Sequence, residues 1–543
     1  MITIYKSVAN CIDRYLPKSI DTEAHQLLFI IALLFVTGTA QGQTYPTSFS
    51  QVQIASGLNG GTAMAVAPDG RIFVAEQTGA LRVVKNGAML STPFISLTVD
   101  SNGERGLIGI ALDPAFATNH YIYLYHTVPG TTAHNRISRY TANGDVVLSG
   151  SEVVILDLDP LSTATNHNGG GMIFGKDGKL YVGVGENANR VNAQNLNNYL
   201  GKVLRINPDG SAPADNPFPT GSASAQRIWA YGLRNPYTLA VQPGTGRIFV
   251  DDVGEGSWEE INDATTGGQN FGWPDAEGMT CTGPSCATNT SYSYPVYTYA
   301  HGTGDGLGCS ITGGTFFNPT TTNYPASYIG RYFFPDYCGD WVNNINLTAN
   351  PATRSSFATG VSGGPVGLAT GNDGNLYLLS RGGLYKLIFA VPDLSPSLSL
   401  PQANFGTSGT ATVGNFAMSI SEVSGYSTTA GSVIVTATAP AGYTLAFPAT
   451  ISTINVTGGT AVAVSNNNWT VTGTVDNRQI SLKMKTGQSI GANSTINLGF
   501  TITRTTANSG STASITVNVT NDGTNSYDSN TTNNGYARII SGL

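Results

Sequence analysis

Charged and titratable side chains are scarce in this chain of 543 residues. Lysine, arginine, aspartate and glutamate make up 11% of it, there are 6 histidines, and the formal net charge is −7. Without basic clusters the chain lacks the positive surface that nucleic-acid binding needs, so we expect no nucleic-acid partner. The 66 glycines, with abundant serine, threonine and asparagine, instead predict an all-β protein of the exported type with two or three domains.

The chain also lacks an apolar run long enough to cross a membrane. The run from Leu27 to Val36 has ten residues, whereas a membrane-spanning helix needs about 20. Small residues follow from Thr37 to Gln43, as is typical of a signal-peptidase site. We predict a signal peptide over 1–42, a secreted, periplasmic or cell-surface location, and no membrane span after its removal. An uncleaved anchor is the alternative.

Cysteine is equally rare. Of the 5 cysteines, Cys11 lies in the predicted leader, and four remain in the mature chain, namely Cys281, Cys286, Cys309 and Cys338. An even count in an exported chain predicts two disulfides, and of the three pairings we expect Cys281–Cys286 with Cys309–Cys338. A zinc site is the alternative, although no histidine stands at ligand spacing.

What the chain does contain is a recurring pattern of apolar strand, tight turn and apolar strand. Clear copies occur at 65–74, 172–182, 239–250 and 368–378, and we expect more divergent ones at 107–125 and 311–345. Such repeats predict a β-propeller of four-stranded blades over 45–390, and the periodicity allows five to seven blades. Loops of a propeller converge at one end of its channel, so distant motifs should meet there.

The composition changes near residues 390–396. From there to Leu543 the chain has no cysteine and no histidine, and Glu422 is its only glutamate. Alternating runs such as 432–437 and 513–519 predict a separate β-sandwich over 396–543. With so few titratable groups this part is a poor catalyst. Its role as a spacer, an adhesive module or a carbohydrate or cell-surface contact stays open, and its turns at 521–525 and 530–534 are weak calcium candidates.

The stretch 166–171 is the clearest candidate for chemistry. His167 and Asn168 are followed by three glycines, just before a turn and a predicted strand over 179–184. Glycines permit positive φ and close approach of backbone or ligand, and a histidine beside them is a candidate general base. The alternative is a histidine that satisfies a turn.

This stretch, with the segments 193–196, 200–206, 215–218, 231–236 and 268–273, resembles the soluble sugar dehydrogenases that depend on pyrroloquinoline quinone (PQQ), the glucose/sorbosone dehydrogenase family. The likeness covers roughly residues 45–390 and implies six blades. It also implies PQQ held over the channel with Ca²⁺, a sugar substrate, and an electron acceptor that the sequence does not identify. The segments 251–262, 311–314 and 330–337 resemble the branch of the family that includes Hedgehog-interacting protein.

The resemblance also implies roles for individual residues. His167, in His-Asn-Gly-Gly, would take the proton of the sugar C1 hydroxyl, with Asn168 beside it at the cofactor. Arg234 and Asn235, in Gly-Leu-Arg-Asn-Pro, would contact cofactor and metal, and Arg234 would stabilise the charge that hydride transfer creates. The alternative for Arg234 is a strand-end arginine that holds carbonyls. Glu104 would stand at the cofactor edge.

Several positions depart from the family pattern. Gly254 and Glu255 match the loop whose carbonyls hold calcium, but the family has glycine-proline there. The stretches 333–340 and 363–370 lack the lysine and arginines that grip the cofactor, although a tricarboxylate needs cationic partners. Arg331 or Arg381 are candidate substitutes. Glu186 and Asp252 could also face a cation, since hard cations prefer carboxylate oxygens; the alternative is that each caps a turn.

Three functions follow as hypotheses. The first is an exported quinoprotein oxidoreductase that oxidises the C1 hydroxyl of aldoses by hydride transfer to PQQ. The second is a non-catalytic propeller that binds carbohydrate or protein, with an adhesive C-terminal module. The third is a propeller lactonase whose metal would be held by carboxylates such as Glu104 and Glu186.

Overall fold

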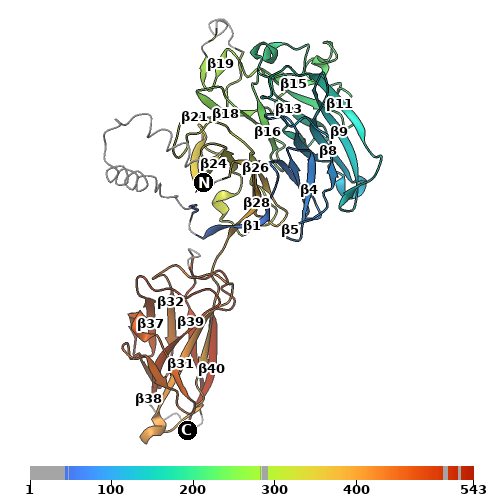
Figure 1. Cartoon of the computed structure of the whole chain (residues 1–543). Coiled ribbons are helices and arrows are strands. Elements are labelled where there is room, and N and C mark those ends of the chain that lie inside the picture. The colour runs from blue at the N-terminus through green and yellow to red at the C-terminus, as the bar shows by residue number, and fades with distance from the viewer. Residues whose placement is uncertain are drawn as a thin grey trace, which may run out of the picture.

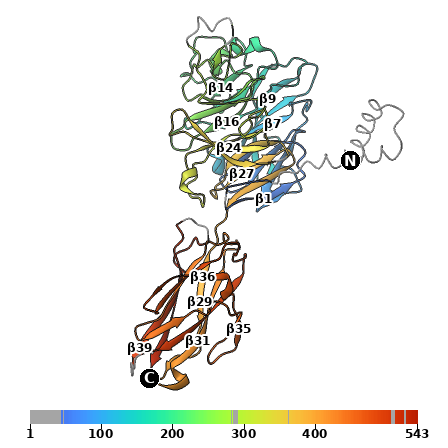
Figure 2. The same ribbon diagram turned by 90° about the vertical axis from the view of Figure 1, so that its left-hand side faces the viewer.

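The computed structural model describes residues 43–543, apart from 47, 282, 284–290, 362, 506–510 and 524–526. The predicted signal peptide over 1–42 and Cys286 lie outside the described residues. Among those described, no helix is long and apolar enough to cross a membrane. Figures 1 and 2 show a ring of β-sheets followed by an elongated β-structure that ends at the C-terminus.

Six antiparallel sheets surround a channel and form the blades of a β-propeller, which confirms the all-β fold and the expected six blades. Blade 1 contains β2 (Gly61–Val66), β3 (Ile72–Glu76), β4 (Ala80–Lys85), β5 (Ala88–Met89) and β6 (Ile95–Ser96). Blade 2 contains β7 (Leu107–Leu112), β8 (Tyr121–Val128), β9 (His134–Asn143), β10 (Val146–Val147) and β11 (Val153–Pro160). Blade 3 contains β12 (Met172–Phe174), β13 (Leu180–Val184), β14 (Lys202–Ile206) and β15 (Ile228–Tyr231). Blade 4 contains β16 (Pro236–Val241), β17 (Ile248–Asp252), β18 (Trp258–Asp263) and β21 (Tyr297–Ala300). Blade 5 contains β22 (Thr315–Phe316), β23 (Tyr332–Asp336), β24 (Trp341–Asn346) and β25 (Thr353–Thr359). Blade 6 contains β26 (Pro365–Thr370), β27 (Leu376–Ser380), β28 (Gly383–Phe389) and β1 (Phe49–Ser56).

The ring is closed by the start of the described chain. β1 pairs antiparallel with β28, with Phe49 opposite Phe389 and Ser56 opposite Gly383. Phe49 also packs edge-to-face against Tyr324 at a centroid distance of 4.8 Å. Because β1 becomes the outer strand of blade 6, the two ends of the propeller are held in one sheet.

The strand–turn–strand copies recognised in the sequence are the hairpins between the first and second strands of the blades. In three of them an aspartate carboxylate accepts the N–H of the residue two positions later, at 3.1, 3.1 and 3.2 Å for Asp69, Asp177 and Asp373. This local hydrogen bond is the reason that aspartate favours turns. The divergent copies are also hairpins, β7–β8 in blade 2 and β22–β23 in blade 5.

Apolar side chains from neighbouring blades pack together and hold the blades in place. Between blades 1 and 2, the buried Phe73 and Leu81 meet Ile122 and Leu124 in one cluster. Such burial contributes about 25 cal/mol per Å² of apolar area. The rigid ring therefore fixes the positions of the loops that join its blades.

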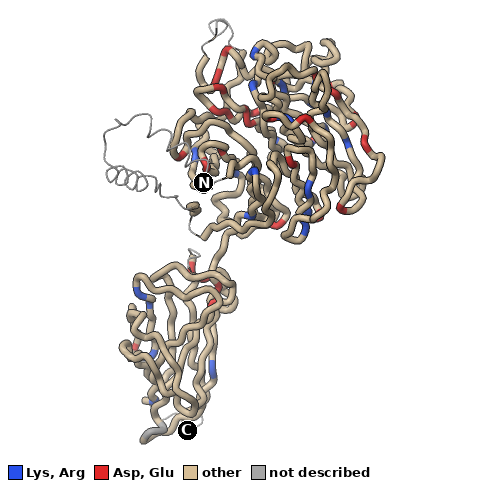
Figure 3. Tube along the Cα trace, viewed as in Figure 1, with Lys and Arg blue, Asp and Glu red and all other residues tan. Residues whose placement is uncertain are grey.

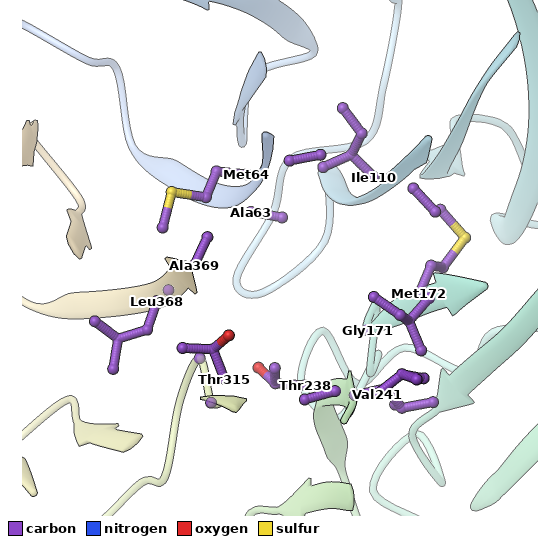
Figure 4. A pocket seen from close by; sticks show the side chains of 18 of the residues that line it. Ala63, Met64, Ile110, Gly171, Met172, Thr238, Val241, Thr315, Leu368 and Ala369 are labelled. Carbon is purple, nitrogen blue, oxygen red and sulfur yellow. The ribbon is translucent and has the colours of Figure 1, made fainter. Parts of the chain in front are cut away.

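The innermost strands of the blades enclose part of the central channel. A cavity of about 370 Å³, here called the channel cavity, is lined by all six of them, β2, β7, β12, β16, β22 and β26. Figure 4 shows Met64, Ile110, Met172, Thr238 and Leu368 around this space. Its surface is mostly apolar, and Thr62, Ile108, Tyr237 and Val366 separate it from a second cavity at one end of the channel.

Residues 390–393 lead from β28 to a second β-structure with a core of its own. One sheet contains β29 (Leu394–Ser399), β31 (Val413–Glu422), β38 (Thr495–Arg504) and β33 (Tyr443–Ala446). The other contains β30 (Asn404–Phe405), β40 (Gly535–Gly542), β39 (Ser511–Val519), β32 (Ile434–Thr438), β37 (Gln479–Met484) and β36 (Trp469–Val475), and a separate hairpin joins β34 (Thr453–Asn455) to β35 (Ala461–Ala463). Buried residues of both sheets, among them Phe416, Phe500, Val435 and Trp469, form one cluster.

Few charges mark this C-terminal two-sheet unit, as the tan trace in Figure 3 shows. Its independence as a domain stays a prediction, as does a calcium site in its turns. Near those turns, Asn533 donates to Asp393 at 2.8 Å and Asn534 donates to Asp528 at 2.6 Å, so both carboxylates accept a hydrogen bond from a side-chain amide.

Short helices and one small hairpin lie in the connections. They are α3 (Phe116–Asn119), η1 (Arg190–Gln194), η2 (Ala225–Arg227), η3 (Ala326–Tyr328), η4 (Gly409–Thr412) and η5 (Asn466–Asn468), with β19 (Ala276–Glu277) paired to β20 (Thr280–Cys281).

Candidate active site

His167 lies in the connection between β11 and β12, in a backbone conformation that depends on its glycines. Its own φ is +56°, and Gly169 and Gly170 follow at +67° and +119°. A Cβ on Gly169 would lie 2.5 Å from the Gly183 carbonyl oxygen, so a larger residue would clash with β13. The glycines therefore let this loop lie directly across the end of β13, as the sequence predicts.

Two carboxylates hold His167. Its Nδ1 lies 2.5 Å from Glu186 Oε1, and its backbone N–H donates to Glu104 Oε2 at 2.7 Å. Glu186 is 1% exposed, and its other oxygen, Oε2, has no hydrogen-bond partner among the described residues. Because a carboxylate accepts, Nδ1 carries the proton and Nε2 is the free basic nitrogen. This is the arrangement of a positioned general base.

Arg234 and Asn235 follow β15 and are held by Asp252. The Asp252 carboxylate accepts the Arg234 N–H at 2.9 Å and the Asn235 N–H at 2.6 Å. Arg234 Nη1 donates to the Val253 carbonyl at 2.9 Å, so the carbonyl-holding role considered from the sequence is real. Its guanidinium also lies 5.8 Å from the Trp273 ring centroid, within cation–π range.

The histidine and arginine motifs are directly bonded to each other. Asn235 Oδ1 accepts the Gly169 N–H at 2.9 Å, and the Arg234 carbonyl accepts the Glu186 N–H at 2.9 Å. His167, Arg234, Asn235 and Glu104 all line one cavity of about 450 Å³ at the end of the channel, here called the site cavity. The tertiary structure thus brings together residues more than sixty positions apart.

Other walls of the site cavity come from residues that the sequence did not single out. They are Gln77, Tyr237, Ser310, Thr312 and Tyr337, with Cys309 beside them. Burial raises the pKa of Tyr237 to about 12, so this phenol at the floor stays protonated at neutral pH. Gln77, Tyr237 and Ser310 lie in none of the motifs quoted from the sequence, and only the folded ring reveals them.

Asn168 does not line the site cavity, although it was predicted to contact the cofactor. Its side chain donates to the Thr165 carbonyl at 2.9 Å and accepts from Asn135 at 3.3 Å, and it is 1% exposed. These contacts stabilise the loop that carries His167, and they point the Asn168 amide away from the cavity.

The predicted metal loop lines the cavity, but its carboxylate is engaged elsewhere. Glu255 forms an ion pair with Arg190, and its N–H donates to Glu277 Oε1 at 2.7 Å. Glu186 binds His167, and Asp252 binds the Arg234–Asn235 backbone. The calcium role of Gly254 and Glu255 stays a prediction. The two carboxylates named for the lactonase hypothesis, Glu104 and Glu186, both hold His167 in this structure.

One more buried carboxyl, that of Glu260, lies next to Asp252. Asp252 in β17 pairs with Glu260 in β18 across the sheet. Burial, and then the charge of Asp252, raise the pKa of Glu260 to about 8. Burial likewise raises the pKa of Asp252 above its usual range. Burying two neighbouring negative charges is energetically unfavourable, so the Asp252–Glu260 pair retains a proton near neutral pH.

A disulfide forms part of the cavity wall. Cys309 and Cys338 are bonded with a Cα–Cα distance of 5.6 Å, which confirms this predicted pairing. The buried Asp336 accepts the N–H groups of Cys309, Ser310, Cys338 and Gly339, and so holds the backbone at both cysteines of the disulfide. Among the described residues, the only cluster with metal-ligand spacing is Cys309, Asp336 and Cys338. Its sulfurs are joined to each other, which excludes zinc there. The Cys281–Cys286 pairing stays a prediction.

The two candidate substitutes for the missing basic residues lie in different places. Arg381 lines the site cavity. Arg331 is bonded to the Ser327 carbonyl at 2.6 Å and to Asn344 at 2.7 Å, and it is not among the cavity residues. Arg331 is therefore excluded as a ligand-binding cation of this cavity.

Fold and site together define a class, that of a six-bladed β-propeller with a histidine–carboxylate pair and an arginine at one end of its channel. A family model described as Glucose / Sorbosone dehydrogenase matches residues 58–382. The chain belongs to this family, as its motifs indicated.

Relatives of two kinds are similar to it. Aldose sugar dehydrogenase YliI of Escherichia coli strain K12 is 32% identical over 221 residues, covering 39% of this chain and 58% of the relative. Quinoprotein glucose dehydrogenase B of Acinetobacter calcoaceticus is 30% identical over 312 residues, covering 50% and 63%. HIPL1 protein of Arabidopsis thaliana is 28% identical over 422 residues, covering 59% and 60%. The chain thus spans less than two thirds of the length of each.

Solved structures share the propeller. The soluble aldose sugar dehydrogenase of Escherichia coli in the apo-form is 25% identical, with a TM-score of 0.56, and the match covers 63% of this chain and 99% of that one. The PQQ-bound form of aldose sugar dehydrogenase from Streptomyces coelicolor is 26% identical, with a TM-score of 0.52 and the same coverage.

Proposed function

We propose that this protein is an exported quinoprotein oxidoreductase, which oxidises the C1 hydroxyl of aldose sugars with PQQ as its hydride acceptor. One observation carries the proposal: His167 is oriented by Glu186 and faces the same cavity as Arg234. The relatives named for aldose or glucose dehydrogenation support the substrate class. Export rests on the leader predicted from the sequence.

The site fits PQQ in size and charge. Its volume of about 450 Å³ lies within the ordinary range for small-molecule sites, about 300–1,000 Å³. Arg234 and Arg381 are the cations among the described residues that line it. They could bind the carboxylates and the quinone oxygens of the cofactor. When bound, PQQ would supply an acceptor for the C1 hydride. The carboxylates of Glu104, Glu186 and Glu255 are each bonded within the protein, and no step is assigned to the metal.

The chain's own residues would supply the proton chemistry. His167 Nε2 takes the C1 hydroxyl proton, while Glu186 keeps the ring oriented and stabilises the imidazolium that forms. Arg234 would stabilise, by electrostatic attraction, the negative charge that develops when hydride leaves C1. Asn235 holds the Gly169 N–H and so keeps the histidine loop against the arginine motif. Tyr237 at the floor offers a neutral hydroxyl donor.

Dye reduction by the purified full chain, with added PQQ, Ca²⁺ and a panel of aldoses, tests this function. We expect activity that His167→Ala lowers by roughly 100-fold or more, as for loss of a general base. His134→Ala is the matched control, since His134 on β9 pairs with Asp157 on β11 and does not line the cavity. Turnover that survives His167→Ala would refute the assigned base.

A binding propeller without turnover is the second candidate. It is favoured by the missing late basic residues and by similarity to HIPL1 protein and to human Hedgehog-interacting protein, which is 26% identical over 219 residues. Saturable binding of a sugar or protein, with no dye reduction under any condition, would favour it over the oxidoreductase.

A further inference from the structure

Arg381 lies at the junction of the last and first blades, where hydrogen bonds hold its side chain. It sits in the tight turn between β27 and β28, and its Nη1 donates to the Gly61 carbonyl at 3.0 Å. Its Nη2 donates to Gln77 Oε1. A Cβ on Gly60 would lie 2.8 Å from Nη2, so the glycine leaves room for the guanidinium. The side chain is therefore held in one direction.

Gln77 links this arginine to the loop that carries Glu104. Its Nε2 donates to the Gly103 carbonyl at 2.6 Å and to the Arg105 carbonyl at 2.9 Å. Its Oε1 is thereby turned toward Arg381. The guanidinium is fixed relative to the same loop whose carboxylate holds the His167 backbone, so its position is coupled to that of the catalytic base.

The charge of Arg381 has no ion-pair partner in the part of the chain that the structure describes. No carboxylate oxygen among the described residues forms a salt bridge with it, whereas Glu255, which also lines the cavity, is paired with Arg190. A guanidinium has about five N–H donors, and the bonds to Gly61 and Gln77 use two of them. The remaining donors of this cavity-lining residue are available to an anionic ligand.

We propose that Arg381 binds a carboxylate of the ligand in the site cavity and so supplies the cation that the stretches 333–340 and 363–370 lack. This inference rests on the proposed function, in which the ligand is the tricarboxylate PQQ. Arg234, held to Val253 and stacked near Trp273, would serve the quinone end. Arg381, which lies in blade 6 and is bonded to blade 1, would bind a carboxylate of PQQ.

Binding measured on the full chain without turnover tests the proposal. The probes are PQQ and its trimethyl ester, which has the same ring system but no carboxylate charge. For Arg381→Gln we expect the Kd of PQQ to rise about tenfold or more and the Kd of the ester to change less than about twofold. Arg381→Lys should fall between, because an ammonium keeps the charge and loses the fork.

Arg331→Gln is the matched control, since it removes the same charge outside the cavity and should leave the Kd of PQQ unchanged. An equal loss of affinity for PQQ and ester in Arg381→Gln, with a lowered Tm, would mean that Arg381 only joins the blades and would overturn the inference. Unchanged PQQ binding in Arg381→Gln would overturn it while sparing the proposed function. A wild-type chain that binds no PQQ would overturn both.

Discussion

Replacing Glu186 by glutamine tests the histidine–carboxylate pair most directly. Glu186 is 1% exposed, contacts His167 Nδ1 at 2.5 Å, and leaves Oε2 without a partner among the described residues. In Glu186→Gln the amide has two orientations. With its oxygen toward Nδ1, the NH₂ occupies the place of Oε2, where a buried donor without an acceptor costs about 1–3 kcal/mol.

In the other orientation the NH₂ faces Nδ1, and the ring must carry its proton on Nε2. His167 then cannot accept the proton of the sugar hydroxyl. Both orientations also lose the negative charge that stabilises the imidazolium. We expect kcat to fall roughly 100- to 10,000-fold, which is the range for loss of a general base.

Steady-state dye reduction by the PQQ-loaded variant measures this effect, with the Kd of PQQ and the Tm recorded on the same protein. Glu152→Gln is the matched control, because Glu152 also accepts side-chain hydrogen bonds, from Ser138 and Tyr140, but lies away from the site cavity. A kcat within about threefold of wild type, with the fold intact, would show that Glu186 neither orients nor charges the base.

Three further outcomes are expected. Cys309→Ser with Cys338→Ser should lower the free energy of unfolding by about 2–4 kcal/mol, since the bond closes a span of 29 positions; calorimetry showing an unchanged Tm would contradict this. Burial raises the pKa of Glu260 to about 8, so its proton stabilises the fold at low pH and that stabilisation is lost as the pH rises toward and past 8. Glu260→Gln should therefore show a smaller drop in Tm between pH 6 and 9 than wild type, and parallel curves would argue against the shift. Trp469→Ala should destabilise the C-terminal two-sheet unit by about 3–5 kcal/mol while the propeller melts as before; a single transition that shifts as a whole would mean that the two are one folding unit.

The sequence by itself determined the architecture of the propeller. The hairpins β2–β3, β12–β13, β16–β17 and β26–β27 follow from local chemistry, because alternating apolar residues and aspartate- or glycine-containing turns specify strands and their connections. The even cysteine count predicted two disulfides, and Cys309–Cys338 was chosen from three possible pairings. Residues 167–171 were recognisable because glycines beside a histidine have a backbone reason to be there.

Only the tertiary structure decided which residues share the site. Glu186, which from the sequence could face a cation or cap a turn, is the partner of His167; Asn168, expected at the cofactor, supports its loop and is not among the residues that line the site cavity. Of the two candidate cations, ring closure places Arg381 in the cavity and leaves Arg331 outside it. These distinctions depend on contacts between blades far apart in the chain, and on the direction of single side chains, which a local pattern does not encode.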